Sequence, residues 1–187
     1  MRAAQLAKSD ARAQARPKSI VNIADIEMRP RPPQYLPKGV AAERDDMRSG
    51  PVSREMGATK LGFNITAIPP GKRAYPFHNH QINEEMFFIL EGDGAIRMGS
   101  ETYAIGKGDL IACPPGGKAT AHQIINTGSV ELKFLAVSTE ISPDLCDYPD
   151  TGKFALMAEM APEDGKPRML AFIGREGQGG VDYWEGE

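Results

Sequence analysis

From about residue 59 onward, short apolar runs alternate with turn-forming residues. The runs are LGFNITAI (61–68), EMFFILEG (85–92), AIRMG (95–99), TYAIG (102–106), DLIAC (109–113), HQIIN (122–126) and LKFLAVS (132–138). Glycine, proline, asparagine or aspartate stands between most of them. Short strand-like segments at this close spacing are typical of an all-β sandwich or barrel, and they do not fit alternating strands and helices.

The two ends of the chain have a different pattern of apolar and polar residues. Residues 1–45 carry little periodic apolar pattern, and RPRPPQYLP (29–37) contains four prolines, which neither a helix nor a central strand accommodates. Beyond residue 140, KFALMAEM (153–160) fits either a short helix or a strand, PRMLAFI (167–173) fits a strand, and GQGGVDYWEGE fits an extended coil. We therefore expect an extended N-terminal arm (1–45), a barrel (46–140) and a C-terminal extension (141–187) that packs on the barrel or on a partner subunit.

Composition narrows the function classes. A length of 187 residues fits one domain with extensions. A net charge of -3 does not indicate the excess of basic residues that is typical of nucleic-acid binding. No apolar run approaches the roughly 18 residues that span a bilayer. The two cysteines stand outside any CxxC pattern, which fits a reducing compartment. We expect a cytoplasmic protein with no nucleic-acid or membrane partner.

The chain has three histidines, and two of them lie in FHNHQINEEMFFILEGDG (77–94). In a strand, residues i and i+2 point to the same face, so His78 and His80 can hold one ion. A carboxylate at the start of the following strand faces back toward this pair, and His122 opens another strand. Three imidazoles and one carboxylate suit a divalent Zn, Mn, Fe, Ni or Co ion, with one or two positions left for water or substrate.

These residues resemble the two motifs of the cupin superfamily. The first motif, G-x5-HxH-x3,4-E-x6-G, is matched with one extra residue after the first glycine by Gly71, His78, His80, Glu85 and Gly92. The second, G-x5-P-x-G-x2-H-x3-N, is matched with a turn three residues longer before the histidine by Gly108, Pro114, Gly116, His122 and Asn126. The resemblance implies a double-stranded β-helix, or jelly-roll, barrel. The acidic stretch DLCDYPDTGK (144–153) also resembles the tails of small single-barrel bacterial cupins of a sugar-phosphate-isomerase-like group. Small single-barrel cupins usually dimerise, so this resemblance implies a homodimer.

The resemblance also implies roles for particular residues. Its metal ligands map to His78, His80, Glu85 and His122, with Glu84 as a competitor of Glu85, because the motif allows a gap of three or four residues. The six-residue spacing to Gly92 favours Glu85 as the ligand and leaves Glu84 as the candidate catalytic base. Apart from these roles, Tyr75, Arg73, Lys60 and Gln123 could contact a polar or anionic ligand, and Phe88 could supply an apolar wall of the ligand pocket. Asn126 fits a turn better than a ligand position.

Two functions remain open at this point. One is a metal-dependent enzyme, isomerase-like or dioxygenase-like, that acts on a small polar molecule. The other is a non-catalytic protein that binds a sugar or an organic acid in the same pocket. A structural zinc site is disfavoured, because such sites typically use cysteines and we expect neither Cys113 nor Cys146 to join the cluster. The single tryptophan, Trp184, must bury its ring somewhere despite its glycine-rich surroundings.

Overall fold

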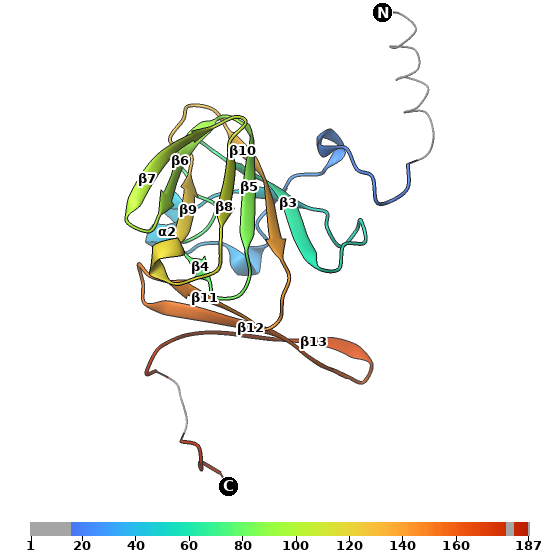
Figure 1. The fold of residues 1–187 in the computed structure, drawn as a ribbon, viewed down its shortest axis with the longest axis vertical. Coiled ribbons are helices and arrows are strands. Elements are labelled where there is room, and N and C mark those ends of the chain that lie inside the picture. Colours follow the sequence, from blue (N-terminus) through green and yellow to red (C-terminus); the bar gives the residue numbers. More distant parts are fainter. Residues whose placement is uncertain (1–15, 179–181, 187) are drawn as a thin grey trace, which may run out of the picture.

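The computed structural model describes residues 16–178 and 182–186, and within them most of the regular secondary structure is antiparallel β-strand (Figure 1). One sheet has six strands in the order β1-β2-β3-β10-β5-β8. Its strands are β1 (Arg29–Pro30), β2 (Arg48–Pro51), β3 (Leu61–Ile68), β5 (Glu85–Glu91), β8 (Leu110–Cys113) and β10 (Leu132–Thr139). A second sheet has the order β7-β6-β9. It consists of β6 (Asp93–Met98), β7 (Glu101–Gly106) and β9 (His122–Ile125).

The two sheets share one apolar core, which confirms the all-β prediction. Their inward side chains form a single buried cluster that includes Ile68, Phe87, Ile89, Ile96, Ile105, Ile111, Ile124, Leu132 and Phe134. Along β5 the burial alternates, because successive side chains point to opposite faces. Phe87 and Ile89 are buried on the inner face, and Glu85 lies on the same face two residues earlier. The barrel interior therefore holds an acidic side chain at the start of β5.

The connection from β5 to β6 shows why a glycine is needed there. Gly92 has φ +80°, a conformation that side chains with a Cβ rarely adopt. A Cβ at this position would also lie 2.5 Å from the carbonyl oxygen of Glu131. The close approach of these two segments joins the start of β6 to the start of β10.

The segment before the barrel runs along the barrel surface. Its short elements are η1 (Ile23–Asp25), η2 (Pro33–Tyr35) and α2 (Val40–Arg44), together with β1. Strand β1 pairs with β2, and Asp45 forms a bridge with Arg73. The Arg31 guanidinium donates a hydrogen bond to the carbonyl of Ala74. These contacts hold residues 29–45 against the barrel.

The C-terminal extension forms a third sheet, with the order β13-β12-β11-β4 (Figure 1). Its strands are β4 (Asn79–His80), β11 (Asp144–Tyr148), β12 (Lys153–Glu163) and β13 (Lys166–Arg175). Residues 153–160, which the sequence left open between helix and strand, are part of a strand. The pairing of β11 with β4 places Cys146 opposite His80. None of the helices in the described residues is long and apolar enough to cross a membrane.

Asn126 closes the turn between β9 and β10 and is fully buried. Its Nδ2 donates to the carbonyls of Ile68 and Val130, both at 2.8 Å, and its Oδ1 accepts from the Gly128 N–H at 2.9 Å. The side chain thus ties the turn to the end of β3. Its place in the motif is explained by this structural role.

We expect Asn126→Ala to lower the free energy of unfolding by about 2–4 kcal/mol, because three backbone groups lose a partner in a buried site. The exposed neighbouring substitution Thr127→Ala, as a control, should change it by less than about 0.5 kcal/mol. Urea unfolding followed by circular dichroism measures both values. Equal effects of the two substitutions would contradict the proposed role of the asparagine.

Candidate metal centre

Backbone pairing brings the three histidines together. His78 and His122 form an antiparallel bridge, in which each N–H donates to the other residue's carbonyl at 3.2 and 2.7 Å. His80 lies two residues after His78, in β4, and its carbonyl accepts from the N–H of Gly116 at 2.8 Å. The 3₁₀ turn η3 (Lys118–Thr120) then leads into His122 at the start of β9. Residues distant in the sequence thus meet at one end of the barrel.

One carboxylate oxygen is the centre of this cluster. Oε2 of Glu85 lies 2.9 Å from Nε2 of His122, 3.3 Å from Nε2 of His80 and 3.5 Å from Nε2 of His78. Donor atoms of His78, His80 and Glu85 all lie within 4.8 Å of one another, as in a group that could hold a metal ion. The structure therefore brings together all four residues that the sequence assigned to the metal.

The other ring nitrogen of each histidine faces an acceptor. In His78, Nδ1 lies 2.9 Å from the carbonyl of Pro76. In His80 it lies 2.6 Å from Oδ2 of Asp144, and in His122 it lies 3.4 Å from the carbonyl of Thr120. An acceptor at Nδ1 favours the tautomer that carries its proton there. The lone pair of Nε2 then points inward, and this is the arrangement that metal-binding histidines use.

The cluster is mostly buried, and the charges inside it perturb one another. Burial alone would raise the pKa of Glu85, but its contacts with the three imidazoles outweigh this effect and hold it well below its usual range. Burial alone would lower the pKa of His80, but contacts with Cys146, Glu85 and Asp144 raise it to about 11. Without a metal, a proton on His80 thus balances the Glu85 carboxylate.

Sequence reasoning missed three residues of β11 that face the cluster. Asp144 accepts from His80 and is itself buried. Cys146 Sγ lies 3.2 Å from Nδ1 of His80, so the expectation that neither cysteine would join the cluster was wrong. The Tyr148 ring stacks on His78, with ring centroids 6.2 Å apart. DLCDY supplies all three, but its local pattern contains no sign that it pairs with β4.

Two of the predicted site residues lie outside the cluster. The Glu84 side chain is exposed and makes no hydrogen bond or ion pair within the described ranges, while its backbone N–H donates to Oγ1 of Thr139. Phe88 follows Glu85 by three residues in β5, so its side chain points to the opposite face of the strand. Phe87 takes the inner position instead, with its ring centroid 5.6 Å from that of His122.

The remaining predicted ligand contacts divide into two groups. Tyr75 packs beside the cluster, with its ring centroid 6.4 Å from that of His78, and burial raises the pKa of its phenol. Gln123 follows His122 in β9 and so points to the opposite face; it donates to the Tyr75 carbonyl at 2.7 Å. Arg73 reaches Gln123 at 3.5 Å. Arg73 and Gln123 therefore support the segment that carries Tyr75 and His78.

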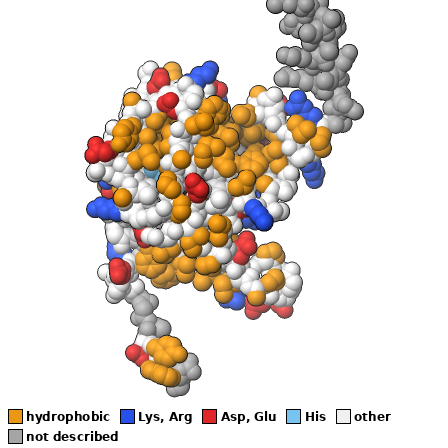
Figure 2. Space-filling view, in the orientation of Figure 1, with side chains coloured by type: hydrophobic (Ala, Val, Ile, Leu, Met, Phe, Trp, Pro, Cys, Tyr) orange, Lys and Arg blue, Asp and Glu red, His pale blue; other side chains and the backbone are white. Residues whose placement is uncertain are grey.

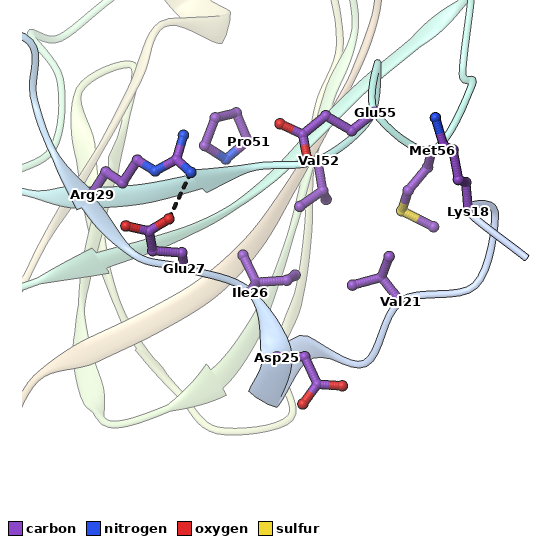
Figure 3. A pocket seen from close by; sticks show the side chains of 10 residues that line it. All are labelled: Lys18, Val21, Asp25, Ile26, Glu27, Arg29, Pro51, Val52, Glu55 and Met56. Atoms are coloured by element: carbon purple, nitrogen blue, oxygen red, sulfur yellow. Dashed lines mark hydrogen bonds and ion pairs between the residues drawn. The ribbon is translucent and has the colours of Figure 1, made fainter. Parts of the chain in front are cut away.

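One hollow, of about 240 Å³, contains His80 and Asp144 in its wall. Asn83, Ser138, Thr139 and Ser142 give its lining polar groups, and Ile141, Met157 and Met169 give it apolar surface. A larger hollow of about 560 Å³ separates the arm from residues 51–56 (Figure 3). Its lining includes the Arg29–Glu27 ion pair but none of the four candidate ligands. Of these two hollows, the smaller one contacts the histidine cluster, through His80.

Comparison with known proteins adds a family and a fold. Residues 64–138 match the model of a family described as "Cupin domain". An uncharacterised protein of Methanocaldococcus jannaschii is 39% identical over 71 residues, which cover 38% of this chain and 54% of that protein. An oxalate-binding protein of Thermotoga maritima is 34% identical over 75 residues, which cover 40% of this chain and 59% of that protein. The match thus spans little more than half the length of these two relatives.

A solved structure extends the likeness beyond the barrel. The structure described as a sugar phosphate isomerase from a cupin superfamily, from Silicibacter pomeroyi, superposes with a TM-score of 0.68 at 18% sequence identity. The superposition covers 88% of this chain and 97% of that one. At this identity the likeness shows the shared fold, which includes most of the two extensions.

The proton on His80 leads to a prediction about pH. A metal at Nε2 requires neutral imidazole, so binding displaces this proton, and the affinity for Zn²⁺ should rise about tenfold per pH unit near neutrality. The direction of this pH dependence follows from the pKa of His80, which is about 11 in the metal-free fold and 6.5 for a free histidine. For the same reason, the proton stabilises the metal-free fold fully below about pH 6.5, and this contribution is lost as the pH rises toward 11. Competition with a chromophoric chelator measures the affinity, and a pH-independent value would contradict this assignment.

We also expect Asp144→Asn to weaken metal binding by about 10–100-fold, because the carboxylate no longer fixes the proton on Nδ1 of His80. The matched control is Asp147→Asn on the same strand, where the carboxylate accepts from Asn79 and Gln81 instead. The same chelator competition measures both variants at one pH, after a thermal melt has confirmed that they are folded. If the two variants bind metal equally well, Asp144 has no positioning role.

Proposed function

Since the chain contains a cupin domain and belongs to the cupin superfamily, we propose that it binds one divalent transition metal and acts as a metal-dependent enzyme on a small polar molecule. His78, His80, Glu85 and His122 would hold the metal. The proposal draws on the donor set of this chain, because a shared fold alone does not fix a function.

One observation carries the proposal: three Nε2 atoms converge on one carboxylate oxygen, at 2.9–3.5 Å, while each Nδ1 faces an acceptor. A structural role would not require three imidazoles to face one buried carboxylate. Buried charges are normally paired or bound to metals, and here the donor atoms are already oriented toward a common point. Neutral imidazole and carboxylate suit Zn, Mn, Fe, Ni or Co.

A bound metal would supply Lewis-acid or redox chemistry at this position. The chain's own residues limit what can reach it. Tyr75 and Tyr148 flank His78, and Phe87 closes the inner side against His122. The hollow of about 240 Å³ beside His80 carries hydroxyl and amide groups next to Ile141, Met157 and Met169, which supports a small ligand that a few polar groups orient.

Isomerase chemistry would need a base beside the metal. Glu84 is exposed, and the alternation of side chains along the strand directs it away from Glu85. The groups beside the cluster that could exchange a proton are Asp144 and Cys146, which contact His80, and the phenols of Tyr75 and Tyr148, whose pKa values burial raises. A dioxygenase-like reaction makes no such demand on the protein, and these surroundings agree with either reaction class.

The second candidate function is ligand binding without turnover. It is favoured by the relative named as an oxalate-binding protein, which is 34% identical over 75 residues. A dicarboxylate would bind the same metal through its oxygens, with no need for a catalytic base. This alternative predicts binding that is lost with the metal and no consumption of the ligand.

The metal content of the protein tests the common basis of both functions. Purified without tag, added metal or chelator, the protein should contain about one Fe, Mn, Ni, Co or Zn per chain by mass spectrometry. The His78→Ala/His122→Ala variant should contain almost none and should remain folded, because the apolar core of the barrel carries most of the stability.

Glu84→Gln is the matched control for Glu85→Gln, since the two glutamates are neighbours with different surroundings. We expect only the Glu85 variant to lose metal. Bound Fe or Mn would direct the next assays to oxygen uptake, and bound Zn to isomerase and hydrolase substrates. Absence of metal in the wild-type protein after reconstitution would overturn the proposed function.

A further inference from the structure

The β12–β13 hairpin extends beyond the sheet to which it belongs. Strand β12 pairs with β11 only over Lys153–Met157, whereas its pairing with β13 continues to Glu163 and Lys166. The outer half of the hairpin is therefore a two-stranded ribbon (Figure 1). Such a ribbon is marginally stable alone in water, so its stability depends on what covers it.

Both faces of the whole hairpin carry apolar side chains. Those between 40% and 67% exposed are Met157, Met160, Met169, Leu170, Phe172 and Ile173. Met169 and Leu170 are consecutive, and so are Phe172 and Ile173, so each pair places one side chain on each face. Figure 2 shows hydrophobic atoms gathered where β12 and β13 lie in Figure 1. Exposed apolar surface of this kind marks an interaction site.

The base of the hairpin contains a hollow of about 330 Å³ with a distinct chemistry. Phe172, Ile173 and Gly174 form an apolar part of its lining, and Lys153 and Arg175 add positive charge to its wall. Gly174 keeps the hollow open, because a Cβ there would lie 2.6 Å from the ring of Phe172. An aromatic group flanked by negative charge would complement this site.

The chain carries such a group near its C-terminal end. Tyr183 and Trp184 pack edge to face, with ring centroids 4.8 Å apart, and lie between Asp182 and Glu185. The N–H of Trp184 donates to Oδ1 of Asp182 at 2.9 Å, and the N–H of Glu185 donates to the Asp182 carbonyl at 3.0 Å. The turn thus presents two aromatic rings between two carboxylates.

We propose that two copies of this chain associate through their β12–β13 hairpins, with Trp184 of each copy seated in the hollow of the other. In the single chain Tyr183 and Trp184 are 83% and 71% exposed, so its own tail does not fill its own hollow. One indole would also leave most of the hairpin uncovered, whereas a second hairpin covers it. A two-fold arrangement satisfies both sites at once, because each copy offers the same hollow and the same tail.

The experiment uses the single tryptophan as its reporter. The wild-type protein should sediment as a dimer and should emit at shorter wavelength than a dissociated sample, because the indole is buried only in the dimer. Ile173→Glu should weaken dimerisation at least about tenfold, which corresponds to about 1.4 kcal/mol. Leu110→Glu is the matched control: Leu110 is 71% exposed on β8 and Ile173 is 67% exposed on β13, so neither change disturbs the core.

A mixing experiment separates exchange between copies from docking within one copy. The Trp184→Ala chain has an intact hollow but no tryptophan, and the Ile173→Glu chain has the only tryptophan in the mixture. Adding the first to the second should shift the emission to shorter wavelength and should form mixed dimers. An unchanged emission, a monomeric wild type at about 100 μM, or equal dimerisation of the Ile173→Glu and Leu110→Glu chains would overturn the proposal.

Discussion

The contact between the Glu85 carboxylate and three imidazoles is the constraint on which the site depends. Removing a carboxylate from water costs free energy unless an ion pair or hydrogen bonds compensate for the lost hydration. No single residue adjacent to Glu85 in the sequence could supply this compensation. Its partners come from the segment 78–80 and from β9, so the pairing requires the two sheets to close into a barrel. The same closure that buries the apolar core also assembles the donor set.

Short-range patterns explain how much of this could be predicted. The alternation of apolar runs predicted the all-β fold, and the spacing of His78 and His80 predicted that they share one side. The choice of Glu85 over Glu84 as the ligand followed from the spacing between Glu85 and Gly92. The geometry places Glu85 at the centre of the cluster. The first two inferences need only the period of a strand, whereas the choice of Glu85 rests on the resemblance to the cupin motif.

The contacts that could not be predicted depend on pairing between distant segments. Asp144 lies 64 residues after His80 and meets it only because β11 pairs with β4. No local pattern encodes that partner. The prediction that Phe88 lines the pocket was wrong for a different reason. A shift of one position along a strand moves a side chain to the opposite face, so Phe87 rather than Phe88 lies beside His122.

The C-terminal sheet links the proposed metal centre to the proposed interface. Strand β11 supplies Asp144, Cys146 and Tyr148 to the histidine cluster, and its other edge pairs with the half of β12 that leads into the exposed hairpin. The hollow beside His80 also includes Met157 and Met169 of that hairpin in its wall. A partner that orders the hairpin would therefore also order one wall of this hollow, because a single run of backbone hydrogen bonds connects the two. In the dimer, access to His80 and the position of Asp144 would then depend on the same packing that holds the subunits together.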